Sequence, residues 1–158
     1  MKQSTLAFII LLSAFTHLSA QKINAIYEQQ AKHLPDGWHK FIEMEVYFDV
    51  EVKDGSMVRG IIVWFDGARY SGSLFGDIIG GRGTYTWPDG SRYEGSFQDN
   101  ARHGRGTMIE IDGSKWGGKW KADRRNGRGK AFNKEGALVQ KGYWENNEFI
   151  GTKKKKRS

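Results

Sequence analysis

The chain of 158 residues contains no cysteine. This absence excludes disulfide bonds, and it also excludes thiol nucleophiles and thiolate metal sites. A fold without such cross-links must be stabilised in other ways, and we expect stacked aromatic rings and the hydrogen bonds of a β-sheet to supply that stability.

Signatures of catalysis are also missing. Of the four histidines, His33, His39 and His103 lie outside the first 20 residues, and no two of them stand at metal-ligand spacing on one element. There is no Gly-x-Ser-x-Gly elbow for a nucleophilic serine. Pairs of acids such as Glu43 and Glu45 fit a solvated strand face. We therefore predict a protein that is not an enzyme, with no cofactor, no metal ion and no nucleic-acid partner.

A long apolar run is absent too, and this bears on the N-terminus. The apolar stretch at residues 6–15 is about half as long as a transmembrane helix. It follows Lys2 and precedes Ser19-Ala20, so residues 1–20 are predicted to be a secretory signal peptide that is cleaved before Gln21. We expect a secreted, periplasmic or cell-envelope protein. A retained anchor with membrane association and a cytosolic location are the alternatives.

What the sequence does contain is glycine, 21 residues in all, many of them arranged in a repeat. Copies of one short motif begin at Tyr70, Tyr93, Trp116 and Gln140, at intervals of 23, 23 and 24 residues, which indicates a repeat architecture. Each copy has a glycine between larger side chains, then a polar turn, a second glycine-containing strand and an acid-glycine turn, which together predict one β-hairpin. The glycines expected to be structural are Gly72, Gly81, Gly83, Gly95, Gly104, Gly106, Gly118, Gly127, Gly129 and Gly142.

This pattern resembles the MORN repeat family. The best match lies at residues 93–113, where the segments 93–97, 103–106 and 112–113 read YEGSF, HGRG and DG. With a degenerate leading copy, the resemblance covers residues 47–151, as in an exported member of the family. Choline- or glucan-binding repeats are also short aromatic–glycine hairpins, but the spacing of the Gly-x-Gly and Asp-Gly pairs fits MORN repeats better.

The hairpin pattern and the resemblance predict an all-β fold, a single-layer antiparallel sheet of tandem β-hairpin repeats with a short N-terminal helix. The helix is predicted because apolar residues recur at helical spacing, at Ile23, Ile26, Tyr27, Ala31 and Leu34. It either caps the first edge of the sheet or forms a mobile leader. The expected boundaries are residues 1–20 for the signal peptide, 21–37 for the helix or leader, 38–69 for a leading hairpin, 70–151 for the MORN-like repeats and 152–158 for a disordered basic tail.

Local patterns predict further details of the hairpins. Residues 42–53 alternate strictly between apolar and polar side chains, which indicates one strand, and a second strand is expected near residues 57–65. In the repeats, the polar run at residues 98–103 predicts a turn that includes His103.

One array of side chains is a candidate site for anions or lipids. The net charge of +7 is concentrated in the later repeats and the tail, and Arg82, Arg105 and Arg128 occupy the same offset in successive copies. They should form a ladder on one side of the sheet, where they either meet an anionic partner or serve only as solubilising charges. The candidate set is Arg82, Arg105, Arg124, Arg125, Arg128, Lys153, Lys154, Lys155, Lys156 and Arg157.

A second array consists of aromatic side chains. Most of these rings are expected in the core, but an open groove could leave some ring faces available to a sugar or a peptide. The candidate groove residues are Tyr70, Tyr85, Tyr93, Phe97, Trp116, Trp120 and Trp144.

These features predict a binding protein. The resemblance to MORN repeats implies a non-enzymatic exported scaffold that mediates protein–protein interaction at the cell envelope or exterior. The alternatives are electrostatic attachment to an anionic phospholipid membrane or wall polymer, and glycan binding in an aromatic groove. The sequence leaves the oligomeric state open.

Overall fold

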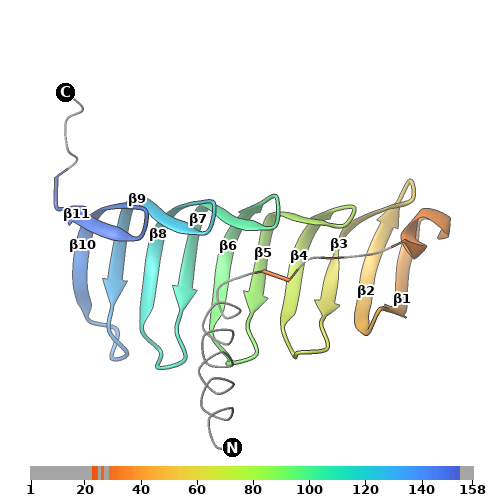
Figure 1. Cartoon of the computed structure of the whole chain (residues 1–158), viewed down its shortest axis with the longest axis horizontal. Helices are drawn as coiled ribbons and strands as arrows, with labels where there is room; N and C mark the ends of the chain where they lie inside the picture. The colour runs from red at the N-terminus through yellow and green to blue at the C-terminus, as the bar shows by residue number, and fades with distance from the viewer. Residues whose placement is uncertain (1–22, 25, 27–28, 154–158) are drawn as a thin grey trace, which may run out of the picture.

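The computed structural model describes residues 23–24, 26 and 29–153, and in them it confirms the all-β prediction. Eleven strands form one open antiparallel sheet in which the strands follow their order in the chain (Figure 1). The strands are β1 (Gly37–Glu43), β2 (Val46–Lys53), β3 (Ser56–Val63), β4 (Arg69–Phe75), β5 (Ile78–Thr86), β6 (Arg92–Gln98), β7 (Ala101–Ile109), β8 (Lys115–Lys121), β9 (Arg124–Phe132), β10 (Leu138–Glu145) and β11 (Glu148–Gly151). No helix in the described ranges is long and apolar enough to cross a membrane.

Two kinds of turn close the hairpins, and from β3 onward each kind lies along one rim of the sheet. One rim has two-residue turns such as Asp99–Asn100, where both φ angles are positive (51° and 59°) and suit the right-handed twist of the flanking strands. The other rim has the acid-glycine turns. There Asp89 Oδ1 accepts hydrogen bonds from the backbone N–H and the hydroxyl of Ser91, and Gly90 takes a φ of 89°.

The structure corrects three local predictions. Residues 42–53 are not one strand, because Met44 and Glu45 form a turn with φ angles of 49° and 63°, and a further strand, β1, precedes it. The two-residue turn pairs Glu43 with Val46 and so reverses which positions face the core. The apolar pattern nevertheless continues through Ile42 and Met44, which are 69% and 75% exposed, so the periodicity could not reveal the turn. The polar run at residues 98–103 contains only the short turn Asp99–Asn100, and His103 lies within β7.

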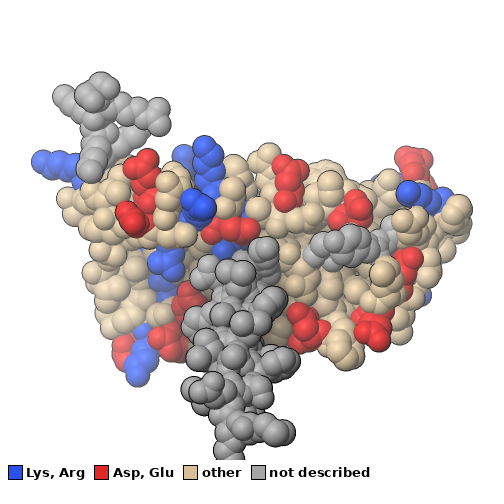
Figure 2. Space-filling view, in the orientation of Figure 1, with Lys and Arg blue, Asp and Glu red and all other residues tan. Residues whose placement is uncertain are grey.

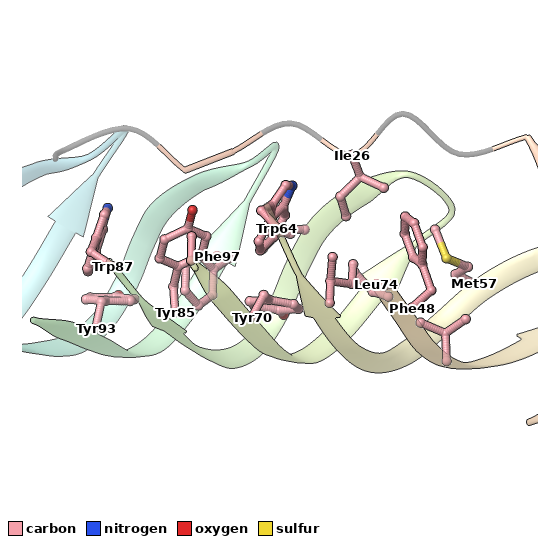
Figure 3. Close-up of a cluster of buried hydrophobic side chains, with 14 of the residues drawn as sticks. Ile26, Phe48, Met57, Trp64, Tyr70, Leu74, Tyr85, Trp87, Tyr93 and Phe97 are labelled. Carbon is pink, nitrogen blue, oxygen red and sulfur yellow. The ribbon is translucent and has the colours of Figure 1, made fainter. Parts of the chain in front are cut away.

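The third correction concerns the N-terminal helix. In the described part of residues 21–37, the only helical element is a 3-10 turn, η1 (Gln30–His33). Ile26 is buried against the hydrophobic core, and the backbone N–H of Asn24 donates to the Tyr85 hydroxyl at 3.1 Å. This segment therefore lies over the core of β3–β5 and does not simply cap the first edge (Figure 3). Tyr27 of the predicted helix lies outside the described residues.

The core occupies one face of the sheet and is a chain of aromatic rings. Tyr70, Tyr93 and Trp116 begin successive repeats, and the rings of Phe97 and Trp120, from the ends of β6 and β8, pack between them. Neighbouring rings meet edge to face, a favoured arrangement: the Tyr70–Phe97, Tyr93–Trp120 and Trp116–Trp144 centroids are 5.5, 5.3 and 5.4 Å apart. Every repeat thus packs against the next through its own rings. Figure 3 shows the part of this core that lies under Ile26.

Candidate functional site

The candidate groove aromatics lie in the core. Each of the seven rings, from Tyr70 to Trp144, is at most 4% exposed. The phenol groups of Tyr70 and Tyr93 donate hydrogen bonds to the carbonyl oxygens of Ser73 and Ser96. With their faces covered by other rings, these side chains offer no platform to a sugar, and the interpretation of this row as an open glycan groove is wrong.

A row of glycines crosses the sheet at positions that face the rings, and its backbone is accessible from the opposite face. Pairing across neighbouring strands aligns one glycine from each of β3 to β10, so the row crosses eight consecutive strands without interruption. Its members are Gly60, Gly72, Gly83, Gly95, Gly106, Gly118, Gly129 and Gly142. The core rings cover this row on their side: a Cβ atom added at Gly83 would lie 2.5 Å from the Tyr70 hydroxyl oxygen. Only backbone therefore remains on the other side.

The glycine row forms the floor of a long open trough, the outer trough. Its central part, about 1010 Å³, is lined by Arg82, Arg105, Lys119 and Arg128, with Ser and Thr side chains along the other wall. Adjoining hollows share residues with it at both ends. One continues past Arg82 to Trp38, and the other continues past Arg128 to Tyr143 and Thr152.

The predicted arginine ladder stands along one wall of this trough. Arg82, Arg105 and Arg128 are exposed and lie on β5, β7 and β9, with one strand between successive arginines. Arg59 on β3 holds the same position in the leading copy, so the ladder has four members. The sequence analysis missed Arg59, although the 23-residue interval before Arg82 points to it.

The charges of the outer trough are mostly uncompensated at its centre. At the N-terminal end, Lys40 pairs with Asp49 at 3.3 Å and Arg59 pairs with Glu51. Among residues 29–153, no salt bridge joins Arg82, Arg105 or Arg128 to a carboxylate. Glu94 lines the centre as well, but it pairs with Arg92 at 2.7 Å. The centre of the trough is therefore positively charged.

Two aromatic side chains mark the ends of the outer trough. The guanidinium carbon of Arg59 lies 5.8 Å from the centroid of the Trp38 ring, and that of Arg128 lies 5.9 Å from the Tyr143 ring. Trp38 is 58% exposed. Neither Trp38 nor Tyr143 is among the seven aromatic residues that the sequence analysis assigned to a groove.

The other predicted cations do not join the ladder. Arg124 is exposed at a hairpin tip, whereas Arg125 is half-buried on the aromatic side, 5.3 Å from the Trp116 ring and 3.8 Å from Glu110. Burial lowers the pKa of the Arg125 guanidinium, while the charge of Glu110 opposes that shift. Lys153 is exposed, and Lys154, Lys155, Lys156 and Arg157 lie outside the described residues. On the face visible in Figure 2, basic and acidic side chains are interspersed along the upper rim, whereas acidic side chains predominate along the lower rim.

A buried cation that the sequence analysis missed lies between two hairpins on the aromatic side. Arg102, on β7, is 5% exposed, and its Nε donates to Asp123 Oδ1 at 2.9 Å. Its guanidinium carbon lies 4.6 Å from the Trp120 ring and 5.5 Å from the Trp87 ring. The available signal was the repeat itself, because Arg102 stands one period after the buried Ile79.

The arrangement suits binding better than chemistry. In the part of the chain that the structure describes, no three His, Asp or Glu side chains gather where they could hold a metal ion. The tyrosines with raised pKa values lie in the core, where burial disfavours their ionisation. The outer trough offers instead exposed guanidinium groups above bare backbone, which can meet carboxylate or phosphate oxygens.

Comparison with known proteins agrees with the repeat. The MORN repeat family model matches residues 70–92, 93–115 and 118–131, and the first two matches begin at Tyr70 and Tyr93, where the repeats were placed. No curated protein matches the chain. The matched segments and the hairpins of the single-layer sheet show that residues 70–131 of this chain consist of MORN repeats.

Proposed function

We propose that this chain is a non-enzymatic binding and scaffold protein of the cell envelope or exterior, and that it holds a protein partner in the outer trough. MORN repeats are typically protein- or membrane-binding modules. The observation that carries the proposal is the trough itself, which crosses the sheet with a floor of glycine backbone and a wall of uncompensated cations.

The shape of the sheet supports binding over catalysis. A single layer of strands leaves the trough open to water along its length, whereas general acid–base chemistry benefits from a site that excludes water. The trough also presents its cations on strands, which hold them at fixed spacing. An extended partner can therefore contact several repeats at once.

Export is part of the proposal and rests on the predicted signal peptide at residues 1–20. Sequencing the N-terminus of the protein recovered from cells that secrete it should show that it begins at Gln21. An N-terminus at Met1 in a cytosolic fraction would contradict this part of the proposal.

The binding proposal is tested by affinity capture from an envelope extract. The bait is the tagged full chain, and the variant replaces Arg82, Arg105 and Arg128 with glutamine. The matched control replaces Arg69, Lys115 and Lys121 with glutamine, which removes the same charge from exposed positions outside the trough lining. We expect the same protein to be recovered with the wild type and the control and to be lost with the trough variant. Recovery of no protein by the wild type would overturn the proposal.

A second candidate function is electrostatic attachment to an anionic membrane or wall polymer. The uncompensated charges of Arg82, Arg105 and Arg128 favour it, because a basic side chain near an anionic bilayer contributes about 1 kcal/mol of attraction. Sedimentation with vesicles of anionic phospholipid across a salt series tests it. Binding that is absent, or that does not weaken with salt, would rule out this candidate.

A further inference from the structure

The spacing of the arginine ladder carries information about its partner. Arg59, Arg82, Arg105 and Arg128 lie on alternate strands, so the backbone positions that carry successive guanidinium groups are separated by two inter-strand distances, about 9.4–9.8 Å. The row runs across the strands, along the long axis of the sheet. A partner that uses the whole ladder must therefore place an anion about every 9.5 Å along a line perpendicular to the strands.

The backbone of the trough narrows the choice of partner. The strands on either side of the glycine row already pair with one another, so β3–β10 have no free edge along the trough to which a partner strand could add. A bound segment must then satisfy its own backbone polar groups or leave them in water. The polyproline II conformation does the latter, because its backbone has no internal hydrogen bonds and is fully solvated.

The spacing of the arginine ladder matches the repeat distance of a polyproline II helix. A polyproline II helix has three residues per turn and rises 3.1 Å per residue, so every third side chain points the same way at intervals of about 9.3 Å. Over the three intervals of the ladder this amounts to about 28 Å, against about 28–29 Å for the arginines. An α-helix repeats its face every seven residues, or about 31.5 Å over three intervals. A β-strand points its third residue to the opposite face.

The ends of the trough fit the same partner. The exposed Trp38 and the half-buried Tyr143, each beside a ladder arginine, flank the row, and proline-rich segments dock in grooves lined by aromatic rings. We propose that the outer trough binds an extended protein segment in the polyproline II conformation that carries a carboxylate at every third residue. This inference rests on the proposed function, since it names the chemistry of the protein partner.

The test compares two acidic peptides of equal composition. One repeats Glu-Pro-Pro, which places a glutamate on one face at each turn, and the other gathers the same glutamates in one block. Fluorescence anisotropy with the full chain at physiological salt measures their affinities. We expect the phased peptide to bind at least about tenfold more tightly, a difference of about 1.4 kcal/mol. Equal affinities would overturn the proposal, because charge alone would then explain binding.

Variants locate the site. Replacing Arg82, Arg105 and Arg128 with glutamine should weaken binding of the phased peptide by about tenfold or more, and the control with Arg69, Lys115 and Lys121 replaced should change it less than about threefold. All six side chains are exposed, and unchanged tryptophan emission confirms that the variants fold. Equal losses in the two variants would overturn the proposal.

Two further outcomes separate this inference from the proposed function. If the trough variant fails to capture the envelope protein and yet neither peptide binds the wild type, the inference is wrong while the proposed function stands. The second outcome is that neither peptide binds, while vesicles of anionic phospholipid bind the wild type and the control variant but not the trough variant. A membrane would then be the ligand of the trough, and the inference would again be wrong.

Discussion

Single glycines decide how the rings of one repeat reach the next. Gly106 and Gly129 lie under the rings of Tyr93 and Trp116, and a methyl group at either position would occupy space that the ring already fills. Gly117 has an ordinary φ and only the Thr107 hydroxyl near its missing side chain, at 3.3 Å. Packing therefore requires glycine at position 106 on β7 but not at position 117 on the neighbouring β8.

We therefore expect Gly106→Ala to lower the free energy of unfolding by about 1–3 kcal/mol, because the Tyr93 ring must shift out of a packed row. The matched variant Gly117→Ala should change it by no more than about 1 kcal/mol, since alanine also restricts the unfolded chain. Urea denaturation followed by tryptophan fluorescence measures both. Similar losses in the two variants would mean that the ring row does not fix the position of the glycine row.

The buried phenols make the fold sensitive to alkali. Burial raises the pKa of Tyr85 to about 12, and it raises the pKa values of Tyr70 and Tyr93 further. In the unfolded chain a tyrosine ionises near pH 10. Because the folded pKa is the higher one, the stabilisation is complete below about pH 10 and is lost as the pH rises through about 12.

We accordingly expect the free energy of unfolding to fall steeply between about pH 10 and pH 12. Urea denaturation across this range gives the profile. The double variant Tyr70→Phe with Tyr93→Phe should be less stable at neutral pH, since two hydrogen bonds are lost, but its stability should fall less with pH. A profile of unchanged steepness would show that other groups cause the alkaline loss.

At the scale of the hairpin, one repeated device joins each tip to the tip before it. The turn residues Asn100, Asp123 and Asn147 each donate their backbone N–H to a carbonyl of the preceding hairpin. Their side-chain oxygens in turn accept the backbone N–H of Ile79, Arg102 and Arg125. The device uses asparagine twice and aspartate once, and the aspartate stands where the partner is the buried cation Arg102.

This comparison predicts how the Arg102–Asp123 pair can be replaced. Asp123→Asn should keep the backbone hydrogen bonds but leave the Arg102 charge without its carboxylate, and we expect a loss of roughly 1–3 kcal/mol because Asp123 is partly exposed. The double variant Arg102→Ile with Asp123→Asn copies the Ile79–Asn100 pair of the repeat before it and should recover most of that loss. Thermal and urea denaturation of the single and double variants form the test. A double variant less stable than the single one would contradict this explanation.

The same hairpins show which features of the fold the sequence repeat can predict and which it cannot. The repeat of 23–24 residues identified every hairpin after Tyr70, because glycine and aromatic positions follow directly from the packing of ring on backbone. It did not locate the turn at Met44–Glu45, which contains neither glycine nor asparagine. Arg102 was assigned to a turn because a run of polar residues resembles a loop, whereas it lies on β7 and is buried beside Trp87 and Trp120.

Prediction of the site was similarly partial. The common offset of Arg82, Arg105 and Arg128 was sufficient to place them on one side of the sheet, because a strand has only two faces. Whether the ring faces are open to a ligand depends on how tightly the rings pack together, and the repeat pattern does not show this. The sequence therefore left the aromatic groove open as an alternative, and the burial of the seven rings excludes it.

At the scale of the whole molecule, the two faces of the sheet have different roles, since one stabilises the fold and the other is accessible for binding. The aromatic face stabilises the stack and is covered in its first half by the segment around Ile26, whereas the opposite face leaves the outer trough accessible. Each of the three repeats that begin at Tyr70, Tyr93 and Trp116 adds one arginine to the ladder and large apolar side chains to the core. Stability and binding length therefore grow together with the number of repeats.

The linear order of strands also determines where the sheet opens. In the described ranges each strand pairs only with its neighbours in the chain, so interior hairpins are supported on both sides and the end strands on one. β11 has four residues and pairs only with Tyr143–Glu145 of β10. We expect amide hydrogen exchange to be slowest in β4–β8 and fastest in β1 and β11, because local opening needs the least free energy where the fewest contacts are lost.

Hydrogen exchange followed by mass spectrometry at neutral pH measures this gradient. Trp144→Ala offers a directed version of the experiment, because its ring is the link between Trp116 and Phe149 at the C-terminal end. The substitution should accelerate exchange in β9 and β10 and leave β2–β4 unchanged, since no ring contact of Trp144 reaches those strands. Equal acceleration throughout the sheet would mean that the repeats open as one cooperative unit, and the local description of stability would then be wrong.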